Sequence, residues 1–162
     1  MGRQSRQELF SFPNPVNEKA ARTVAAVVLL TSVVALATSA YWLLIVLAIG
    51  FWARVLTGPT LSPLGRFAMW FARTNLGEPA YVPGPPKRFA QGMGAVITTA
   101  GAIAAVGFGL HAAGDVLLVM MIVAAGLESI FAYCVGCKVF ALGMRAGLVP
   151  ERVCLECANI TA

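Results

Sequence analysis

The chain has 162 residues, of which 59% are hydrophobic and only 12% are charged, and its net charge is +5. A water-soluble domain of this size could not cover so much apolar surface with so few charges. The twelve Lys and Arg residues stand between apolar runs and form no single basic cluster, which argues against a nucleic-acid partner. The composition therefore predicts an all-α integral membrane protein whose main partner is the lipid bilayer.

The first apolar region contains no charged residue between Arg22 and Arg54. These 31 positions are too many for one ordinary span of about 20 residues and are enough for two short ones. Small and polar residues around Ser39 favour a tight turn there. We expect a helical hairpin with spans at residues 23–39 and 41–57, although one long tilted helix also fits the length.

A proline-rich segment, residues 58–91, follows the first hairpin. Because proline interrupts helices, we predict that this segment is a loop outside the hydrocarbon layer. Within it, between Leu64 and Leu76, large apolar side chains recur at helical spacing: Leu64, Phe67, Trp70 and Phe71. This pattern predicts an interfacial helix between the two hairpins, although a helix packed on the bundle fits equally well.

The second apolar region predicts two more spans, at residues 92–113 and 116–137, with a short turn at Asp115. In the first of them, small residues recur every three or four positions: Gly94, Thr98, Ala102, Ala105 and Gly109. Such a row lets helix backbones approach closely in lipid, so we interpret it as a packing surface. The predicted fold is thus four transmembrane helices arranged as two hairpins.

The basic residues set the predicted orientation. All of them precede the first span, lie in or beside the 58–91 loop, or follow the fourth span, and neither predicted hairpin tip has one. The positive-inside rule then places residues 1–22, the central loop and the tail at 149–162 in the cytoplasm. A three-span arrangement would split these charges across the membrane, so the charge pattern also favours four spans.

Four cysteines form two pairs, Cys134/Cys137 at the end of the fourth span and Cys154/Cys157 in the tail. Two thiols separated by two residues can close a small disulfide ring, and the neighbouring Lys138 favours the reactive thiolate. A lasting structural disulfide is not expected on the cytoplasmic side. The pairs therefore predict a membrane thiol–disulfide oxidoreductase or sulfur-relay protein, with these four cysteines as catalytic residues and a thiol-bearing protein as partner.

The same spacing also fits a metal site. Sixteen residues separate the two pairs, which is within the range of four-thiolate zinc sites. Cys134, Cys137, Cys154 and Cys157 could thus hold zinc or an iron–sulfur centre in a noncatalytic membrane subunit. A third interpretation is an assembly or scaffold subunit of a larger membrane complex, in which the cysteines have no chemical role.

Glu128 is a second candidate catalytic residue, since we expect it near the middle of the fourth span, where a carboxylate is costly and usually functional. It could relay a proton to the thiols, or bond as a neutral acid to Thr98, Thr99 or Ser129 and fix the helix packing. Because six residues separate Glu128 from Cys134, a regular helix would point the two side chains in different directions.

Three stretches of the sequence carry a resemblance: Ser62-Pro63-Leu64, the segment from Arg88 to Gly94, and Cys134-Val-Gly-Cys137-Lys138 followed by Phe140. Over roughly residues 14–148 the chain resembles the DUF4395 family of bacterial membrane proteins, a family without an established activity. The resemblance implies a compact four-span protein of the bacterial inner membrane, in which the paired cysteines close the last span. Cys154 and Cys157 lie beyond the family core.

A looser similarity is to quinone-linked disulfide-forming membrane enzymes, which also carry a CxxC pair at the end of a helix in a four-helix bundle. That similarity implies that Cys134 and Cys137 exchange electrons with a quinone. The tail pair, Cys154 and Cys157, would then pass electrons to a protein partner.

Overall fold

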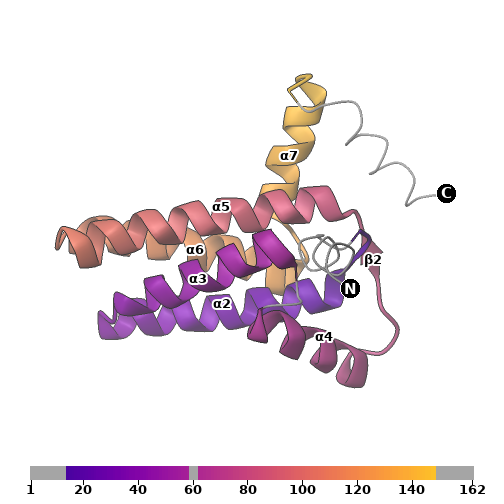
Figure 1. Cartoon of the computed structure of the whole chain (residues 1–162), viewed down its shortest axis with the longest axis horizontal. Helices are drawn as coiled ribbons and strands as arrows, with labels where there is room; N and C mark the ends of the chain where they lie inside the picture. Colours follow the sequence, from indigo (N-terminus) through magenta and orange to yellow (C-terminus); the bar gives the residue numbers. More distant parts are fainter. Residues whose placement is uncertain (1–13, 59–61, 149–162) are drawn as a thin grey trace, which may run out of the picture.

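The computed structural model describes residues 14–58 and 62–148. Four helical segments lie side by side as a bundle, one shorter helix packs against it near one end, and another projects away from the bundle at the same end (Figure 1). The bundle helices are α2 (Glu18–Thr38), α3 (Trp42–Thr57), α5 (Gly84–Ala102), which continues as the π-helical turn η1 (Ile103–Gly107), and α6 (His111–Phe131). The remaining elements are β1 (Val16–Asn17), α4 (Pro63–Asn75), β2 (Tyr81–Val82) and α7 (Val135–Arg145).

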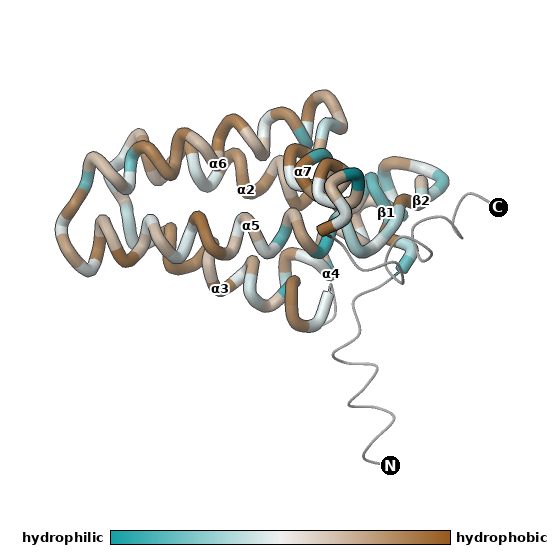
Figure 2. Tube along the Cα trace, turned by 90° about the horizontal axis from the view of Figure 1, so that it is seen from above, coloured by the Kyte–Doolittle hydropathy of each residue, from teal (hydrophilic) through white to brown (hydrophobic). Residues whose placement is uncertain are grey.

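Three helical segments are long and apolar enough to cross a membrane: α2, α5 with η1, and α6. The fourth bundle helix, α3, is apolar but has only 16 residues. Large apolar side chains are exposed on the outside of the bundle, for example Leu30 at 64% and Ile49 at 65%. Hydrophilic positions gather at the end where β1, β2 and α7 lie (Figure 2). An apolar outer surface of this kind indicates a membrane protein.

Close helix contacts hold the bundle together, with α2 packed along α6 and α3 along α5. A Cβ atom added to Gly94 would lie 2.5 Å from the ring of Phe51, so the absence of a side chain lets α5 approach α3. Of the predicted row of small residues, Gly94, Thr98 and Ala105 are buried, whereas Gly109 lies in the turn before α6 with a φ of 66°.

The first turn lies at Ser39 and Ala40, where the sequence analysis places it, and Ser39 has a left-handed φ of 54°. The two turns of the bundle contact each other, because the Tyr41 hydroxyl donates a 2.9 Å hydrogen bond to Asp115. The Tyr41 ring also stacks on His111, with the ring centroids 4.8 Å apart.

The helix that contains the predicted third span starts before residue 92, because α5 begins at Gly84. Pro85 and Pro86 occupy the first turn of α5, where a backbone N–H has no intrahelical partner and proline is therefore tolerated. The second turn was misplaced. It lies at Phe108–Leu110, before Asp115, because Gly109 supplies the left-handed backbone.

The predicted fourth span, residues 116–137, is replaced by two helices. The first, α6, ends at Phe131, the chain reverses its backbone at Ala132 with a φ of 56°, and α7 begins at Val135. The guanidinium of Arg22 donates to the carbonyl oxygens of Ser129 and Ile130 at 3.1–3.2 Å, which satisfies carbonyls that the helix end leaves open. No glycine or proline marks this break in the sequence.

The central loop contains the expected helix, α4, which packs against α2. Ser62 caps its first turn by accepting a hydrogen bond from Gly65 N–H at 3.2 Å. The loop then returns along the N-terminal segment, where β1 and β2 pair antiparallel with Val16 opposite Val82. This short sheet was not predicted, and it ties the loop to the start of α2.

The contact between Gly94 and Phe51 gives a first prediction. Gly94→Ala should lower the stability of the protein by about 1–3 kcal/mol, because the added methyl group overpacks the α3–α5 contact. Gly92→Ala is the matched control on the same helix. An added Cβ there meets nothing within 4 Å, so this change should be neutral or raise stability by up to about 1 kcal/mol. Thermal unfolding in detergent, followed by circular dichroism, measures both; equal effects would contradict the packing assignment.

Candidate functional site

The break after α6 places Cys134 at the start of a helix. Cys134 is the N-cap of α7, and its sulfur accepts a hydrogen bond from the backbone N–H of Cys137 at 3.4 Å. The sequence analysis placed this pair at the C-terminal end of a span. That placement is wrong, and the correction matters chemically, because the N-terminus of a helix carries partial positive charge and stabilises a thiolate.

The two thiols differ in acidity. A hydrogen bond from the Cys137 side chain is the largest influence on the pKa of Cys134 and lowers it, and the Lys87 ammonium and the Cys137 N–H act in the same direction. Burial and the Glu128 carboxylate oppose them, but the pKa of Cys134 stays below its usual value. The bond to Cys134, together with burial, raises the pKa of Cys137. Cys134 is therefore the more acidic thiol of the pair.

The glycine of the Cys134-Val-Gly-Cys137 motif lets α7 press against α5. A Cβ atom on Gly136 would lie 2.5 Å from the Cβ of Ala90 and 2.6 Å from its Cα. The rings of Phe89 and Phe140 also meet, with centroids 5.6 Å apart. Because α5 is part of the bundle, these contacts hold the cysteine pair against the end of the bundle and fix its position.

An ion pair lies beside the thiols. The Lys87 ammonium contacts the Glu128 carboxylate at 2.8 Å, and the two side chains are only 7% and 17% exposed. Glu128 comes from the last turn of α6 and not from the middle of a span, which corrects the predicted position. The hydroxyl groups of Thr98, Thr99 and Ser129 donate to backbone carbonyls instead.

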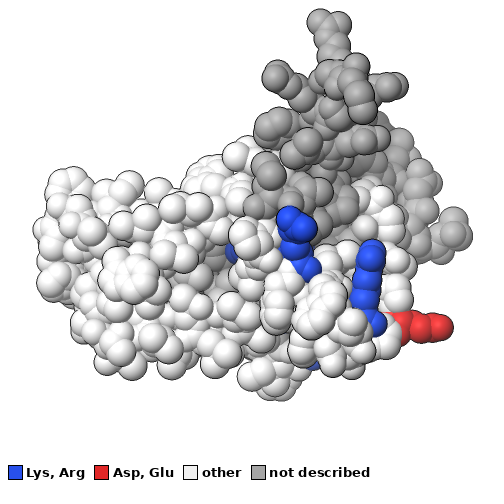
Figure 3. Space-filling model, turned by 60° about the horizontal axis from the view of Figure 1, so that its bottom comes forward, with Lys and Arg blue, Asp and Glu red and all other residues white. Residues whose placement is uncertain are grey.

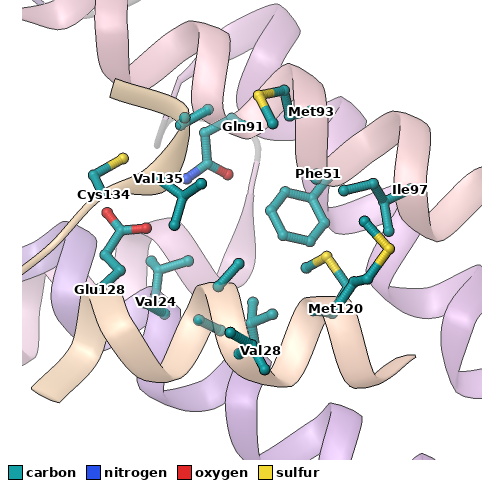
Figure 4. A pocket seen from close by; sticks show the side chains of 18 of the residues that line it. Val24, Val28, Phe51, Gln91, Met93, Ile97, Met120, Glu128, Cys134 and Val135 are labelled. Carbon is teal, nitrogen blue, oxygen red and sulfur yellow. The ribbon is translucent and has the colours of Figure 1, made fainter. Parts of the chain in front are cut away.

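A pocket of about 380 Å³ opens next to this group, between α2, α5 and α6. Its walls are apolar over most of their area, with Glu128 and Cys134 at one end (Figure 4). Three lining residues on α6, Val119, Met120 and Val123, are about half exposed on the apolar outer surface. Cys134 thus lines an apolar pocket that can be reached from the side of the bundle.

The structure does not test the predicted four-thiolate metal site. Cys154 and Cys157 lie outside the described residues, so the four-thiolate zinc or iron–sulfur site stays a prediction. Among residues 14–58 and 62–148, no three His, Cys, Asp or Glu side chains are close enough together to hold a metal ion. Cys134 and Cys137 are both free thiols.

A family model for DUF4395, a domain of unknown function, matches residues 16–145. The chain belongs to the DUF4395 family. No curated protein and no solved structure matches it.

In this DUF4395 chain, the segment from Arg88 to Gly94 packs beside the cysteine pair. Several of its residues contact another helix: Arg88 donates to the Val55 carbonyl at 3.1 Å, Ala90 meets Gly136, Gln91 accepts from Arg54 at 2.8 Å, and Gly94 meets Phe51. The segment thus joins α5 to both α3 and α7.

Lys87 was not predicted to be part of the site, because the prolines before it led us to place it in a solvated loop. Two signals could have found it. Proline is common in the first turn of a helix, so the third span could start at Gly84. An acid such as Glu128 in an apolar helix also needs a cation nearby, and Lys87 stands just before the next apolar segment.

The two members of the ion pair should shift the pKa of Cys134 in opposite directions. Lys87→Met removes a positive charge that favours the thiolate, so the pKa should rise, whereas Glu128→Gln removes a negative charge and should lower it. The rate of iodoacetamide alkylation against pH reports this pKa. The background carries Cys137→Ser, Cys154→Ser and Cys157→Ser, so that Cys134 is the only thiol. If both variants shift the pH midpoint in the same direction, the changes reflect general disruption of the site and the electrostatic assignment is wrong.

Proposed function

We propose that this protein is a membrane thiol–disulfide oxidoreductase, in which Cys134 and Cys137 alternate between the dithiol and the disulfide. The observation that carries this proposal is the position of Cys134. It caps α7, accepts hydrogen bonds from the Cys137 side chain and N–H, and has a lowered pKa, while its partner thiol stands one helical turn away. A thiolate is the attacking and leaving species of disulfide exchange.

The difference in exposure between Cys134 and Cys137 supports an order for the steps of disulfide exchange. Cys137 is half-buried and Cys134 is only 8% exposed, so an incoming partner thiolate attacks the Cys137 sulfur of the disulfide. The bond between the two cysteines breaks, and Cys134 leaves as the stabilised thiolate. A second partner thiolate then attacks the partner's own sulfur in the mixed disulfide, and Cys137 leaves and takes up a proton. The partner dithiol becomes a disulfide, and the protein's disulfide becomes a dithiol.

The lowered pKa of Cys134 also supports a direction of electron transfer, from the thiols of the partner to the disulfide of this protein. It stabilises the reduced form of the pair, which makes the disulfide form the stronger oxidant. We assign Lys87 and Glu128 to setting the charge beside Cys134. The exchanging partner is a protein thiol, for which the tail pair Cys154 and Cys157 is the first candidate in the sequence.

The apolar pocket supports a lipid-soluble oxidant that restores the disulfide. In the proposed step, the reduced pair gives two electrons and the proton of Cys137 to a quinone, a second proton comes from water, the quinone becomes a quinol, and a bond forms between Cys134 and Cys137. The pocket contains the more acidic thiol, Cys134, and opens at the apolar surface of α6 through Val119, Met120 and Val123. A quinone dissolved in the bilayer would enter from that side.

The membrane arrangement proposed for this function has four spans in the bacterial inner membrane and both termini in the cytoplasm. At 1.5 Å per residue, α3 is about 24 Å long, and the turn at Ser39 returns it to the end where α2 begins. The Lys and Arg residues of the described ranges lie at that end of the bundle: Lys19, Arg22, Arg54, Arg66, Arg73, Lys87, Arg88, Lys138 and Arg145.

Single cysteines test this topology in intact cells. In a background without the four native cysteines, Leu110→Cys in the second turn should react with a membrane-impermeant maleimide added outside, and Arg145→Cys in α7 should react only after the cells are opened. The reverse pattern would overturn the orientation. Labelling of both positions from the same side would overturn the four-span arrangement.

The redox proposal is tested with protein carrying Cys154→Ser and Cys157→Ser, which keeps only the membrane-proximal pair. In anaerobic glutathione buffers, the two remaining thiols should disappear and return together as a two-electron couple, counted by alkylation and mass spectrometry. With dithiothreitol as donor and decylubiquinone as acceptor, quinone reduction should fall to the protein-free rate in Cys134→Ser and in Cys137→Ser. Decylubiquinone is chosen because its ring is fully substituted and does not add thiols.

The outcomes separate the parts of the proposal. A reversible pair without quinone reduction would leave disulfide exchange standing and remove the quinone. A pair that never oxidises would overturn the oxidoreductase proposal. Metal content is measured on wild-type protein purified without added metal, where about one zinc or one cluster per chain with four blocked thiols would favour the metal-bound subunit instead.

A further inference from the structure

A second cavity, of about 210 Å³, lies at the basic end of the bundle, between the start of α2, the end of α3, and α4 and α5. Three cationic side chains line it, Arg54, Arg73 and Lys87, and no aspartate or glutamate does. On the face shown in Figure 3, no lysine or arginine side chain is visible at the left-hand end of the molecule, and those in view lie from the middle toward the other end. Because Lys87 is paired with Glu128, the excess positive charge of the cavity lining comes from Arg54 and Arg73.

Arg54 is the unusual member of this group because it is only 6% exposed. Its Nε donates to the neutral amide oxygen of Gln91 at 2.8 Å, and its guanidinium lies 4.6 Å from the centroid of the Phe51 ring. Among the described residues, Lys87 has Glu128 as an ion-pair partner, but no carboxylate forms an ion pair with Arg54. Burying an arginine with only neutral partners is unfavourable, because the lost hydration is not replaced by an opposite charge.

The surroundings of Arg54 compensate its charge only in part. Arg54 lies in the last turn of α3, where the helix dipole provides partial negative charge, and an aromatic face and an amide oxygen provide a little more. A guanidinium has five N–H donors in a planar fork that suits tetrahedral oxyanions, and a single side-chain hydrogen bond from Nε is recorded for it within the described residues. The side chain is held by Gln91 and Phe51 at the wall of a cavity large enough for such an anion.

We propose that this cavity binds an oxyanion of the phosphate or sulfate class, with Arg54 as the buried ligand and Arg73 as the exposed cation at the rim. The oxyanion supplies the negative charge that Arg54 lacks among the described residues. Its source is either the phosphate group of an anionic lipid or a free oxyanion in solution. This inference rests on the cationic lining of the cavity and on the burial of Arg54, and it does not depend on the redox function.

The test compares thermal unfolding of the full-length protein, delipidated in dodecyl maltoside, with millimolar sodium phosphate, sodium sulfate or sodium chloride at equal ionic strength. Phosphate or sulfate should raise the Tm of the wild type by about 3–5 °C at ten times the dissociation constant. Concentrations in this range avoid the general stabilisation by sulfate at high concentration. A parallel sample receives phosphatidylglycerol or phosphatidylcholine, and native mass spectrometry counts the retained lipid.

Two variants with one matched control make the test specific. Arg54→Met should lose the oxyanion-dependent rise in Tm and, without oxyanion, should be at least as stable as the wild type, because an uncompensated buried charge is removed. Arg73→Gln should weaken the response. Arg66→Gln is the control, since Arg66 is exposed on the same helix and does not line the cavity, and it should respond like the wild type.

Retention of phosphatidylglycerol over phosphatidylcholine that depends on Arg54 would identify a lipid phosphate as the ligand. A response to phosphate or sulfate alone would identify a free oxyanion. The proposal is overturned if neither probe acts on the wild type, or if Arg54→Met responds as strongly as the wild type does. Because Arg73 is exposed, its variant keeps the test decisive even if Arg54→Met fails to fold.

Discussion

The ion pair between Lys87 and Glu128 joins the start of α5 to the end of α6, and the arrangement around the thiols depends on it. Both charges are largely buried, and removing one partner of such a pair typically costs about 3–5 kcal/mol because the other is left uncompensated. Since Glu128 stands in the last turn of α6, the pair sets where that helix ends relative to α5. Arg22, which donates to the final carbonyls of α6, fixes the same end from α2.

The reversal at Ala132 follows from this arrangement and decides the chemistry of the cysteines. If α6 had continued through residue 137, Cys134 and Glu128 would point in different directions, and the helix C-terminus would disfavour a thiolate. The chain instead turns and starts α7, so that Cys134 becomes an N-cap and lines the same pocket as Glu128. Gly136 then allows α7 to lie against Ala90 of α5.

The sequence predicts well that the protein is helical and membrane-embedded, and where its first turn lies. These features depend on the overall composition of the chain and on the uncharged stretch between Arg22 and Arg54. The helix in the central loop was found from the spacing of its aromatic residues. The start of α5 was missed because proline breaks a helix in its interior but not in its first turn. The break at Ala132 left no signal, since an alanine adopts positive φ only where tertiary contacts, here Arg22 and the packing of α7, compensate its cost.

The two buried cations, Lys87 and Arg54, have different roles because their partners differ. Lys87 is paired with a carboxylate, so its charge is retained close to the thiols and adjusts their acidity without requiring a ligand. Among the described residues Arg54 contacts the neutral side chains of Gln91 and Phe51, and it lines a cavity that has no carboxylate among its lining residues. Gln91 lines both cavities, which places the apolar pocket of the thiols and the basic cavity on the two sides of one α5 side chain. The first turns of a single helix thereby separate a site suited to an apolar oxidant from one suited to an anion.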